Sequence, residues 1–215
     1  MNLKNEHNLL KTCLIHSKNE NHNNKINSEK FRKIANNNSF STHNRPFRLS
    51  SVALILYNKG QETHSLFIKR ATYSGYHSNQ YALPGGKKDK SDITTVQTAI
   101  RETYEELGIL IKPKEIIGQL DPILIPISNY IVFPYVVFLD HAPIDKPDKT
   151  EVEECYHYPI SELLSPDSEI QTEVILNNTP VEVYAYKIQN QIIWGATAIM
   201  LFDFKNRLKN IKAIF

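Results

Sequence analysis

The sequence predicts an α/β protein in which helices cover both faces of a mixed β-sheet. Short runs rich in Val, Ile, Leu and Phe alternate with turn residues, as expected for the strands of a buried sheet. Two longer segments, one near the middle and one near the end of the chain, have apolar residues at helical spacing. With 215 residues, 41% of them hydrophobic, the chain is long enough for one such domain plus additional segments.

The apolar runs define the predicted strands. Residues 51–57 and 65–70 form the first pair, because Asn58-Lys59-Gly60 between them is typical of a turn. A turn at Asn190-Gln191 joins the last two strands. We expect the remaining strands at residues 116–120, 131–140, 181–188 and 192–194.

Three helical segments are predicted. The middle helix begins at Ser91 or Asp92, either of which can cap its start, and ends at Gly108, which suits the left-handed position after a helix. Residues 159–164 indicate a single helical turn. A final amphipathic helix is expected over residues 197–209, with its first residue, a threonine, as the cap.

The middle helix separates apolar from acidic side chains. Glu102, Glu105 and Glu106 occupy positions i, i+3 and i+4 and therefore lie within about 100° of one another. The apolar positions lie about 140° away and are Ile93, Val96, Ala99, Ile100, Tyr104 and Leu107. We therefore expect this helix to pack on its apolar side and to present its carboxylates outward.

Three acidic side chains on one helical patch repel one another, which lowers stability unless a partner compensates. Hard cations such as Mg²⁺ take carboxylate oxygens, waters and substrate phosphates as ligands. A solvated acidic face without a metal is the alternative, since charged helix faces are common. The glycine-rich turn Gly85-Gly86-Lys87 before the helix and the adjacent Arg101 favour the metal interpretation.

The chain contains the segment LPGGKKDKSDITTVQTAIRETYEELGI, which resembles the Nudix box. That box has the pattern G, five residues, E, seven residues and REUxEExGU, with U a bulky apolar residue. Residues 101–109 match its second half, apart from Thr103 at a bulky position. Asp92 stands where the general box has Glu, and eight residues separate it from Arg101. The resemblance implies a Nudix-type α/β/α sandwich over residues 48–215.

Further segments resemble the coenzyme A diphosphatase branch of that family. The branch has a PGGK turn followed by an aspartate at the longer spacing, and an arginine at the position of Arg70, fourteen residues before the proline of the turn. Residues 125–130, IPISNY, and residues 193–198, IWGATA, also resemble bacterial members. Gly75 and Asn79 stand where the branch has a second arginine and a glycine, so other nucleotide substrates stay open.

This resemblance implies a metal site on the middle helix. Glu102, Glu105 and Glu106 are the expected ligands of Mg²⁺ or Mn²⁺, and Glu102 and Glu105 are also expected to take part in catalysis. The carbonyl of Gly86 is expected to complete the ligand shell, because turn glycines allow the backbone to approach a ligand closely. Hydrolysis of a diphosphate needs such charge neutralisation together with an activated water.

Other residues are expected to surround the metal. Arg101 is expected to orient a glutamate rather than to touch substrate. Glu151 is the expected base or additional ligand, with a solvated loop charge as its alternative. Arg70 and Lys87 are expected to bind substrate phosphates. His77 is expected to be structural.

These features together imply a metal-dependent hydrolase. It would cleave the diphosphate linkage of coenzyme A or its thioesters to 3′,5′-ADP and (acyl-)4′-phosphopantetheine. Hydrolysis of another nucleoside diphosphate derivative, such as ADP-ribose or a dinucleotide, is the first alternative. A non-catalytic Nudix binding module is the second, although a pure binder has no need to maintain crowded carboxylates.

The N-terminal segment, residues 1–47, differs from the remainder in composition. The first 50 residues contain nine Lys or Arg, three Glu and many Asn, whereas the remainder has a net charge of −4. We expect this segment to be partly disordered or to form short helices that pack on the domain or on a second subunit, so a homodimer stays open. Sparse aromatic residues and scattered lysines argue against nucleic-acid binding.

Composition also bears on location. No run of about 18 apolar residues occurs, so no membrane span is expected. The two cysteines, Cys13 and Cys155, match no metal spacing and favour a reducing compartment over a disulfide framework. Because the first residues also lack a secretory profile, we expect a cytoplasmic protein.

Overall fold

The computed structural model describes Leu10 and residues 47–72, 79–125, 128–176 and 179–209. Its strands are β1 (Arg48–Lys59), β2 (Glu62–Arg70), β3 (Tyr81–Ala82), β4 (Gly85–Lys87), β5 (Ile116–Gln119), β6 (Ile123–Ile125), β7 (Tyr130–Leu139), β8 (Val152–Pro159), β9 (Glu169–Leu176), β10 (Thr179–Ile188) and β11 (Gln191–Trp194). Its helices are α3 (Thr95–Leu107), α4 (Ile160–Leu164) and α5 (Gly195–Lys209), with 3₁₀ turns at Pro113–Glu115 and Pro166–Ser168.

Within the described residues, strands β1 to β8 form one mixed sheet. Its main order is β3-β2-β1-β7-β5, while β4 pairs with β1, β6 with β7 and β8 with β2. Strands β1 and β7 run parallel, and the other pairs are antiparallel. A second, antiparallel sheet has the order β11-β10-β9. The glycine-rich strand β4 lies beside the first half of β1, paired with Ser50–Val52.

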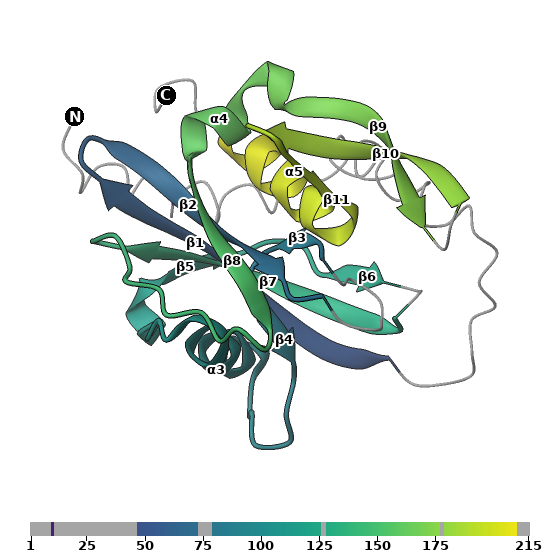
Figure 1. The fold of residues 1–215 in the computed structure, drawn as a ribbon. Helices are drawn as coiled ribbons and strands as arrows, with labels where there is room; N and C mark the ends of the chain where they lie inside the picture. Colours follow the sequence, from purple (N-terminus) through teal and green to yellow (C-terminus); the bar gives the residue numbers. More distant parts are fainter. Residues whose placement is uncertain (1–9, 11–46, 73–78, 126–127, 177–178, 210–215) are drawn as a thin grey trace.

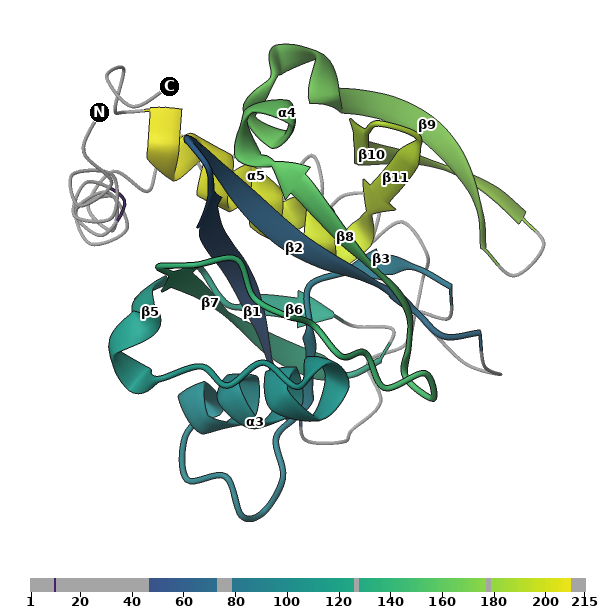
Figure 2. The ribbon, with the colours of Figure 1, turned by 60° about the vertical axis from the view of Figure 1, so that its left-hand side comes forward.

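Helices cover the large sheet on both faces. Figures 1 and 2 show α3 on one side of β1, β2 and β7, and α5 with the small sheet on the other. Successive residues of a strand point to opposite faces, so Ile55 packs in the cluster that contains Leu107 of α3. Its neighbour Leu54 packs in the cluster that contains Phe204 of α5. The predicted α/β/α sandwich with a mixed sheet is thereby confirmed.

The long predicted strands are present, but the sequence patterns missed five others. Strands β3, β4 and β6 have two or three residues each, too few to show a period. The sequence of β8, VEECYHYP, has no continuous apolar run, and β9 is an edge strand of the small sheet. Two details were wrong. The final helix begins at Gly195 and includes Thr197, and the last hairpin turns at Gln189 and Asn190.

Predictions that concern His77 and most of the N-terminal segment lie outside the described residues. Leu10 is the described exception in residues 1–46: it is helical and only 1% exposed, and it belongs to the same apolar cluster as Phe204. Leu10 is therefore part of the core of the domain. None of the helices in the described ranges is long and apolar enough to cross a membrane.

We expect Leu10→Ala to lower the free energy of unfolding by about 2–5 kcal/mol, because it removes buried methyl groups and leaves a cavity. Urea unfolding curves of the full chain measure this loss. Leu110→Ala is the matched control, since Leu110 is largely exposed and its truncation changes stability by roughly 0.5 kcal/mol or less. Equal small losses in both variants would show that Leu10 is not part of the core.

Candidate active site

The turn between β3 and α3 depends on two glycines that pack against other groups. Strand β4 pairs with β1 so closely that a Cβ on Gly85 would lie 2.2 Å from the carbonyl oxygen of Ser51. Gly85 also has φ of +142°, a conformation that side chains disfavour. A Cβ on Gly86 would lie 2.3 Å from a carboxylate oxygen of Glu102. A side chain at Gly85 would collide with the backbone of β1, and one at Gly86 would displace the Glu102 carboxylate.

The start and end of α3 are fixed by local caps. Thr94 caps the helix, because its hydroxyl accepts from the Gln97 amide while the Gln97 side chain accepts from the Thr94 amide. The predicted caps, Ser91 and Asp92, were therefore wrong, since Asp92 is engaged elsewhere. Gly108 adopts the predicted left-handed conformation, with φ of +67°, and its amide donates to a carbonyl of the last turn.

The predicted orientation of α3 was partly wrong. Ile93 and Tyr104, expected in the core, are 83% and 56% exposed. The buried side chains of the helix are Thr98, Ala99, Thr103, Glu106 and Leu107. The helix is rotated so that a glutamate, not only apolar groups, faces the sheet. Thr103, which stands at a bulky apolar position of the box, is small enough to let the helix approach β4.

Glu106 is the most deeply buried of the three glutamates, with 1% of its surface exposed. Its Oε2 accepts a 2.7 Å hydrogen bond from the Gly85 amide. Its Oε1 lies 3.8 Å from Nη1 of Arg70 and accepts no hydrogen bond among the described residues. Burial raises the pKa of Glu106 to about 8, and the charges of Glu102 and Glu151 act in the same direction. A cation beside this carboxylate would be strongly favoured.

Glu102 lies one turn earlier on α3, against the next residue of β4. Its carboxylate contacts the position of Gly86, as Glu106 contacts Gly85. Burial raises the pKa of Glu102, while Arg101 lowers it; the charges of Glu105 and Glu151 raise it further. Two carboxylates thus face two consecutive residues of the glycine turn.

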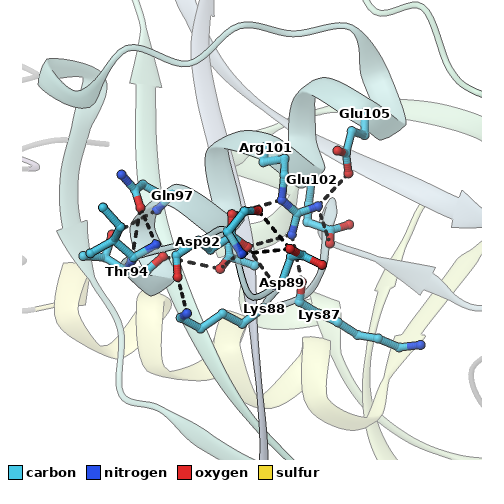
Figure 3. A network of polar contacts seen from close by, with 12 residues as sticks. Lys87, Lys88, Asp89, Asp92, Thr94, Gln97, Arg101, Glu102 and Glu105 are labelled. Carbon is cyan, nitrogen blue, oxygen red and sulfur yellow. Dashed lines mark hydrogen bonds and ion pairs between the residues drawn. The ribbon is translucent and has the colours of Figure 1, made fainter.

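Arg101 is the centre of a polar network (Figure 3). Its Nε and Nη2 donate to the two oxygens of Asp92, at 3.0 and 2.8 Å, and Nη2 also donates to the Lys87 carbonyl. Its Nη1 lies 2.6 Å from Glu105 and 2.9 Å from Glu102. All three nitrogens are occupied, so Arg101 joins the turn to the glutamates.

Asp92 fixes the other end of this network. The hydroxyl of Thr98 and the Asp89 amide donate to its Oδ2, in addition to the Arg101 guanidinium. The Lys88 ammonium donates to its backbone carbonyl. The hydrogen bonds from Arg101 lower the pKa of Asp92 to about 2. The sequence placed Asp92 in the box but did not reveal this role, because it lies nine residues from Arg101, outside the i+3 and i+4 spacing of helical pairs.

The remaining predicted residues lie around the carboxylates. Glu105 is exposed and bonded to Arg101 rather than facing the sheet. Lys87 is exposed, and Figure 3 shows its side chain extending away from the network. Arg70, at the end of β2, lies beside Glu106, and its Nε is buried without a partner among the described residues.

Glu151 lies in the turn that leads into β8. Its backbone carbonyl accepts from the Ala71 amide, which fixes this turn beside the end of β2. The side chain is exposed, yet its charge raises the pKa of both Glu102 and Glu106. Glu151 therefore belongs to a hydrogen-bonded turn and not to an unattached loop.

The donor set is consistent with a hard divalent cation. Carboxylate oxygens of Glu102 and Glu106 face the turn, and the buried Oε1 of Glu106 has no hydrogen-bond donor among the described residues. In the described part of the chain, no three acidic, histidine or cysteine side chains converge on one point as they stand. The guanidinium of Arg101 draws Glu102 and Glu105 toward itself.

The network around Arg101 predicts a specific acid sensitivity. The depressed pKa of Asp92 means that its contribution to stability is complete above its ordinary value of 3.8 and is lost as the pH falls through about 2. Between these values the wild-type protein should lose about 2 kcal/mol more unfolding free energy than Asp92→Asn. Urea unfolding at pH 2 to 5 measures the difference. Parallel pH curves for the two proteins would contradict the ion pair.

Comparisons with known proteins agree with this geometry. Residues 47–177 match the family model described as NUDIX domain. The chain is 32% identical over 162 residues to an uncharacterized Nudix hydrolase NudL of Photorhabdus laumondii, which covers 75% of this chain and 86% of that protein. Among solved structures, a MutT/nudix family protein from Enterococcus faecalis has a TM-score of 0.56 at 20% identity and covers 85% of this chain and 69% of its own. A MutT protein from Methanosarcina mazei has a TM-score of 0.52 at 22% identity, and the match covers 79% of this chain and 99% of that protein.

Proposed function

This chain belongs to the Nudix hydrolase family, and on that premise we propose that it cleaves the diphosphate linkage of coenzyme A or its thioesters. Water attacks one phosphorus, the phosphoanhydride bond breaks, and the products are 3′,5′-ADP and (acyl-)4′-phosphopantetheine. The observation that most supports hydrolysis is the pair of carboxylates, Glu102 and Glu106, held against consecutive residues of the glycine turn.

In this proposal Glu102 and Glu106 hold Mg²⁺ or Mn²⁺, with the Gly86 carbonyl as a further ligand and Glu105 at the exposed rim. When bound, the cation supplies charge neutralisation at the phosphoryl oxygens and a more acidic water. Burial supports the assignment, because the raised pKa of Glu106 reflects a desolvated site. In such a site the attraction between a carboxylate and a cation is stronger than in water.

Arg101 acts through its neighbours. Since its nitrogens already contact Asp92, Lys87, Glu102 and Glu105, it has no donor left to present to a substrate without breaking one of these bonds. Its role in the proposal is to keep the turn and the glutamates in one arrangement. Such preorganisation matters because misplacement of catalytic groups by about 1 Å can cost 10²-fold in rate.

Glu151 is the proposed base. Its turn is bonded to Ala71, next to Arg70, and Arg70 lies beside Glu106. Its charge also raises the pKa of both Glu102 and Glu106. A carboxylate in this position is a suitable group to accept a proton from a water. As an exposed carboxylate, it also remains accessible to solvent water.

Arg70 and Lys87 are the proposed phosphate-binding residues. Arg70 lies beside Glu106, and its buried Nε has no hydrogen-bond partner among the described residues. The side chain of Lys87 extends away from the Arg101 network, as Figure 3 shows. Guanidinium and ammonium groups form strong charge-assisted hydrogen bonds with phosphate. Arg70 is the first candidate to pair with the 3′-phosphate, a charge that ADP-ribose lacks.

The choice of coenzyme A rests on the sequence segments shared with that branch, the PGGK turn with its longer spacing to Arg101 and the IWGATA segment at residues 193–198. In the structure this segment joins β11 to the first turn of α5. The departures at Gly75 and Asn79 favour, as second candidate, another nucleoside diphosphate derivative such as ADP-ribose.

Substrate choice is tested by comparing coenzyme A with dephospho-coenzyme A, which differ only in the 3′-phosphate. Charge-assisted hydrogen bonds to phosphate are worth about 1.5–3 kcal/mol, so kcat/KM should be roughly 10- to 100-fold higher for coenzyme A. The release of 3′,5′-ADP, followed by chromatography with Mg²⁺ and with Mn²⁺, measures this ratio. ADP-ribose and diadenosine polyphosphates complete the panel.

Glu102→Gln is the catalytic control in that assay and should lower turnover by at least about 10²-fold, because it removes a charge that holds the cation. Equal efficiencies with and without the 3′-phosphate, or a preference for ADP-ribose, would favour the second candidate. Unchanged turnover in Glu102→Gln would contradict the metal site itself.

A further inference from the structure

The segment between β7 and β8 is fastened along the end of α3. The Lys146 amide donates to the Leu107 carbonyl at 2.7 Å, and the Asp148 amide donates to the Glu106 carbonyl at 2.8 Å. The segment therefore satisfies carbonyls of the last helical turn, which otherwise lack partners inside a helix. Through these bonds it is joined to the residue whose side chain faces Gly85.

The far end of this segment is Glu151, and its turn is closely bonded. The carbonyl of Asp148 accepts from the amides of Glu151 and Val152, at 3.0 and 2.8 Å. Its side chain accepts from the amide and hydroxyl of Thr150. The direction in which Glu151 leaves the segment is thus set by where residues 145–148 lie.

The near end of the segment is held by a chain of polar side chains on the sheet. Nε2 of His157, on β8, lies 3.1 Å from Oδ1 of Asp145, and Nδ1 lies 2.6 Å from the hydroxyl of Tyr57, on β1. A carboxylate only accepts, so Nε2 donates to Asp145, and Nδ1 accepts the Tyr57 proton. Burial and the neighbouring Asp145 also raise the pKa of the Cys155 thiol.

This chain is built into the sheet rather than lying free on the surface. Tyr57 is almost fully buried and packs edge-on to His157, and its pKa is raised to about 12 by burial and by the Asp145 charge, so it stays a proton donor at neutral pH. Hydrogen-bonded networks of buried polar side chains are often no more stabilising than apolar residues of the same size. Their contribution is then to fix one conformation of the groups that they connect.

We propose that Tyr57, His157 and Asp145 are positioning residues that hold Glu151 in place through the segment bonded to the last turn of α3. The inference rests on the proposed function, in which Glu151 acts on the water. The three side chains have no contact with substrate in this proposal. They set the position of residues 145–151. The bonds of that segment to α3 then set the distance from Glu151 to Glu102 and Glu106.

The test compares Asp145→Ala with Asp145→Asn in coenzyme A hydrolysis. Alanine removes the acceptor, whereas the asparagine oxygen still accepts from His157. We expect Asp145→Ala to lower kcat about 5- to 30-fold with little change in KM, because a group is displaced rather than removed, and Asp145→Asn to recover most of the rate. Tyr57→Phe, which removes only the hydroxyl, should give a smaller loss of kcat and serves if Asp145→Ala does not fold. Ser161→Ala is the matched control, since it breaks a 2.7 Å bond to Glu62 that involves none of residues 145–151.

A double-mutant cycle identifies the route of the effect. In a Glu151→Gln background, Asp145→Ala should have no further effect on kcat, because the positioned group is already absent. An equal loss in both backgrounds, or an unchanged kcat in the single variant, would overturn the proposal.

Hydrogen exchange gives a readout without substrate. In Asp145→Ala, amides in residues 145–151 should exchange at least about tenfold faster, while those of Ser161→Ala should not. Unchanged exchange overturns the anchoring, whatever the enzyme cleaves. If the wild-type protein leaves coenzyme A intact but exchange changes as expected, the proposed function fails and the anchoring stands.

Discussion

The carboxylate of Glu106 lies inside the protein, between the Gly85 amide and the guanidinium of Arg70, and the surrounding structure follows from keeping it there. A buried carboxylate without a strong partner is costly, and its raised pKa expresses that cost. To reach the Gly85 amide, α3 must lie close to β4, and a Cβ on Gly86 would then lie 2.3 Å from the Glu102 carboxylate. Gly85 itself is held against the backbone of β1, at Ser51 and Val52. The small Thr103 on the same helical face permits this approach.

Two further polar arrangements keep this contact in register. Arg101 joins α3 to the turn through Asp92 and the Lys87 carbonyl, which fixes the helix along its axis. The segment that ends at Glu151 bonds to the last carbonyls of α3 and brings a third acidic side chain near the first two. Acidic groups that repel one another are thus held by bonds to the backbone and to arginine, which is an arrangement suited to a cation.

Sequence patterns predicted the sandwich, the long strands and the acidic helix because these features repeat with the period of their secondary structure. They failed where tertiary contacts decide. Ile93 and Tyr104 fit the apolar face by spacing, but Ile93 precedes the first residue of α3, and with Glu106 turned to Gly85, Tyr104 is left exposed. Asp145 and His157 gave no local signal, because they meet through β8 and a long connection, and only the fold brings them together. The glycine pair and the box helix were predictable as neighbours because they are adjacent in sequence.

The central claim is that the buried carboxylate pair binds a divalent cation, and calorimetric titration of the full chain with Mn²⁺ tests it most directly. Glu106→Gln keeps the size of the side chain and an oxygen for the Gly85 amide but removes the charge. It should weaken Mn²⁺ binding by more than the roughly tenfold that loss of an outer-shell partner costs. Glu162→Gln, on α4, is the control and should bind as the wild type does. Equal Mn²⁺ affinity in the wild type and in Glu106→Gln would contradict the account.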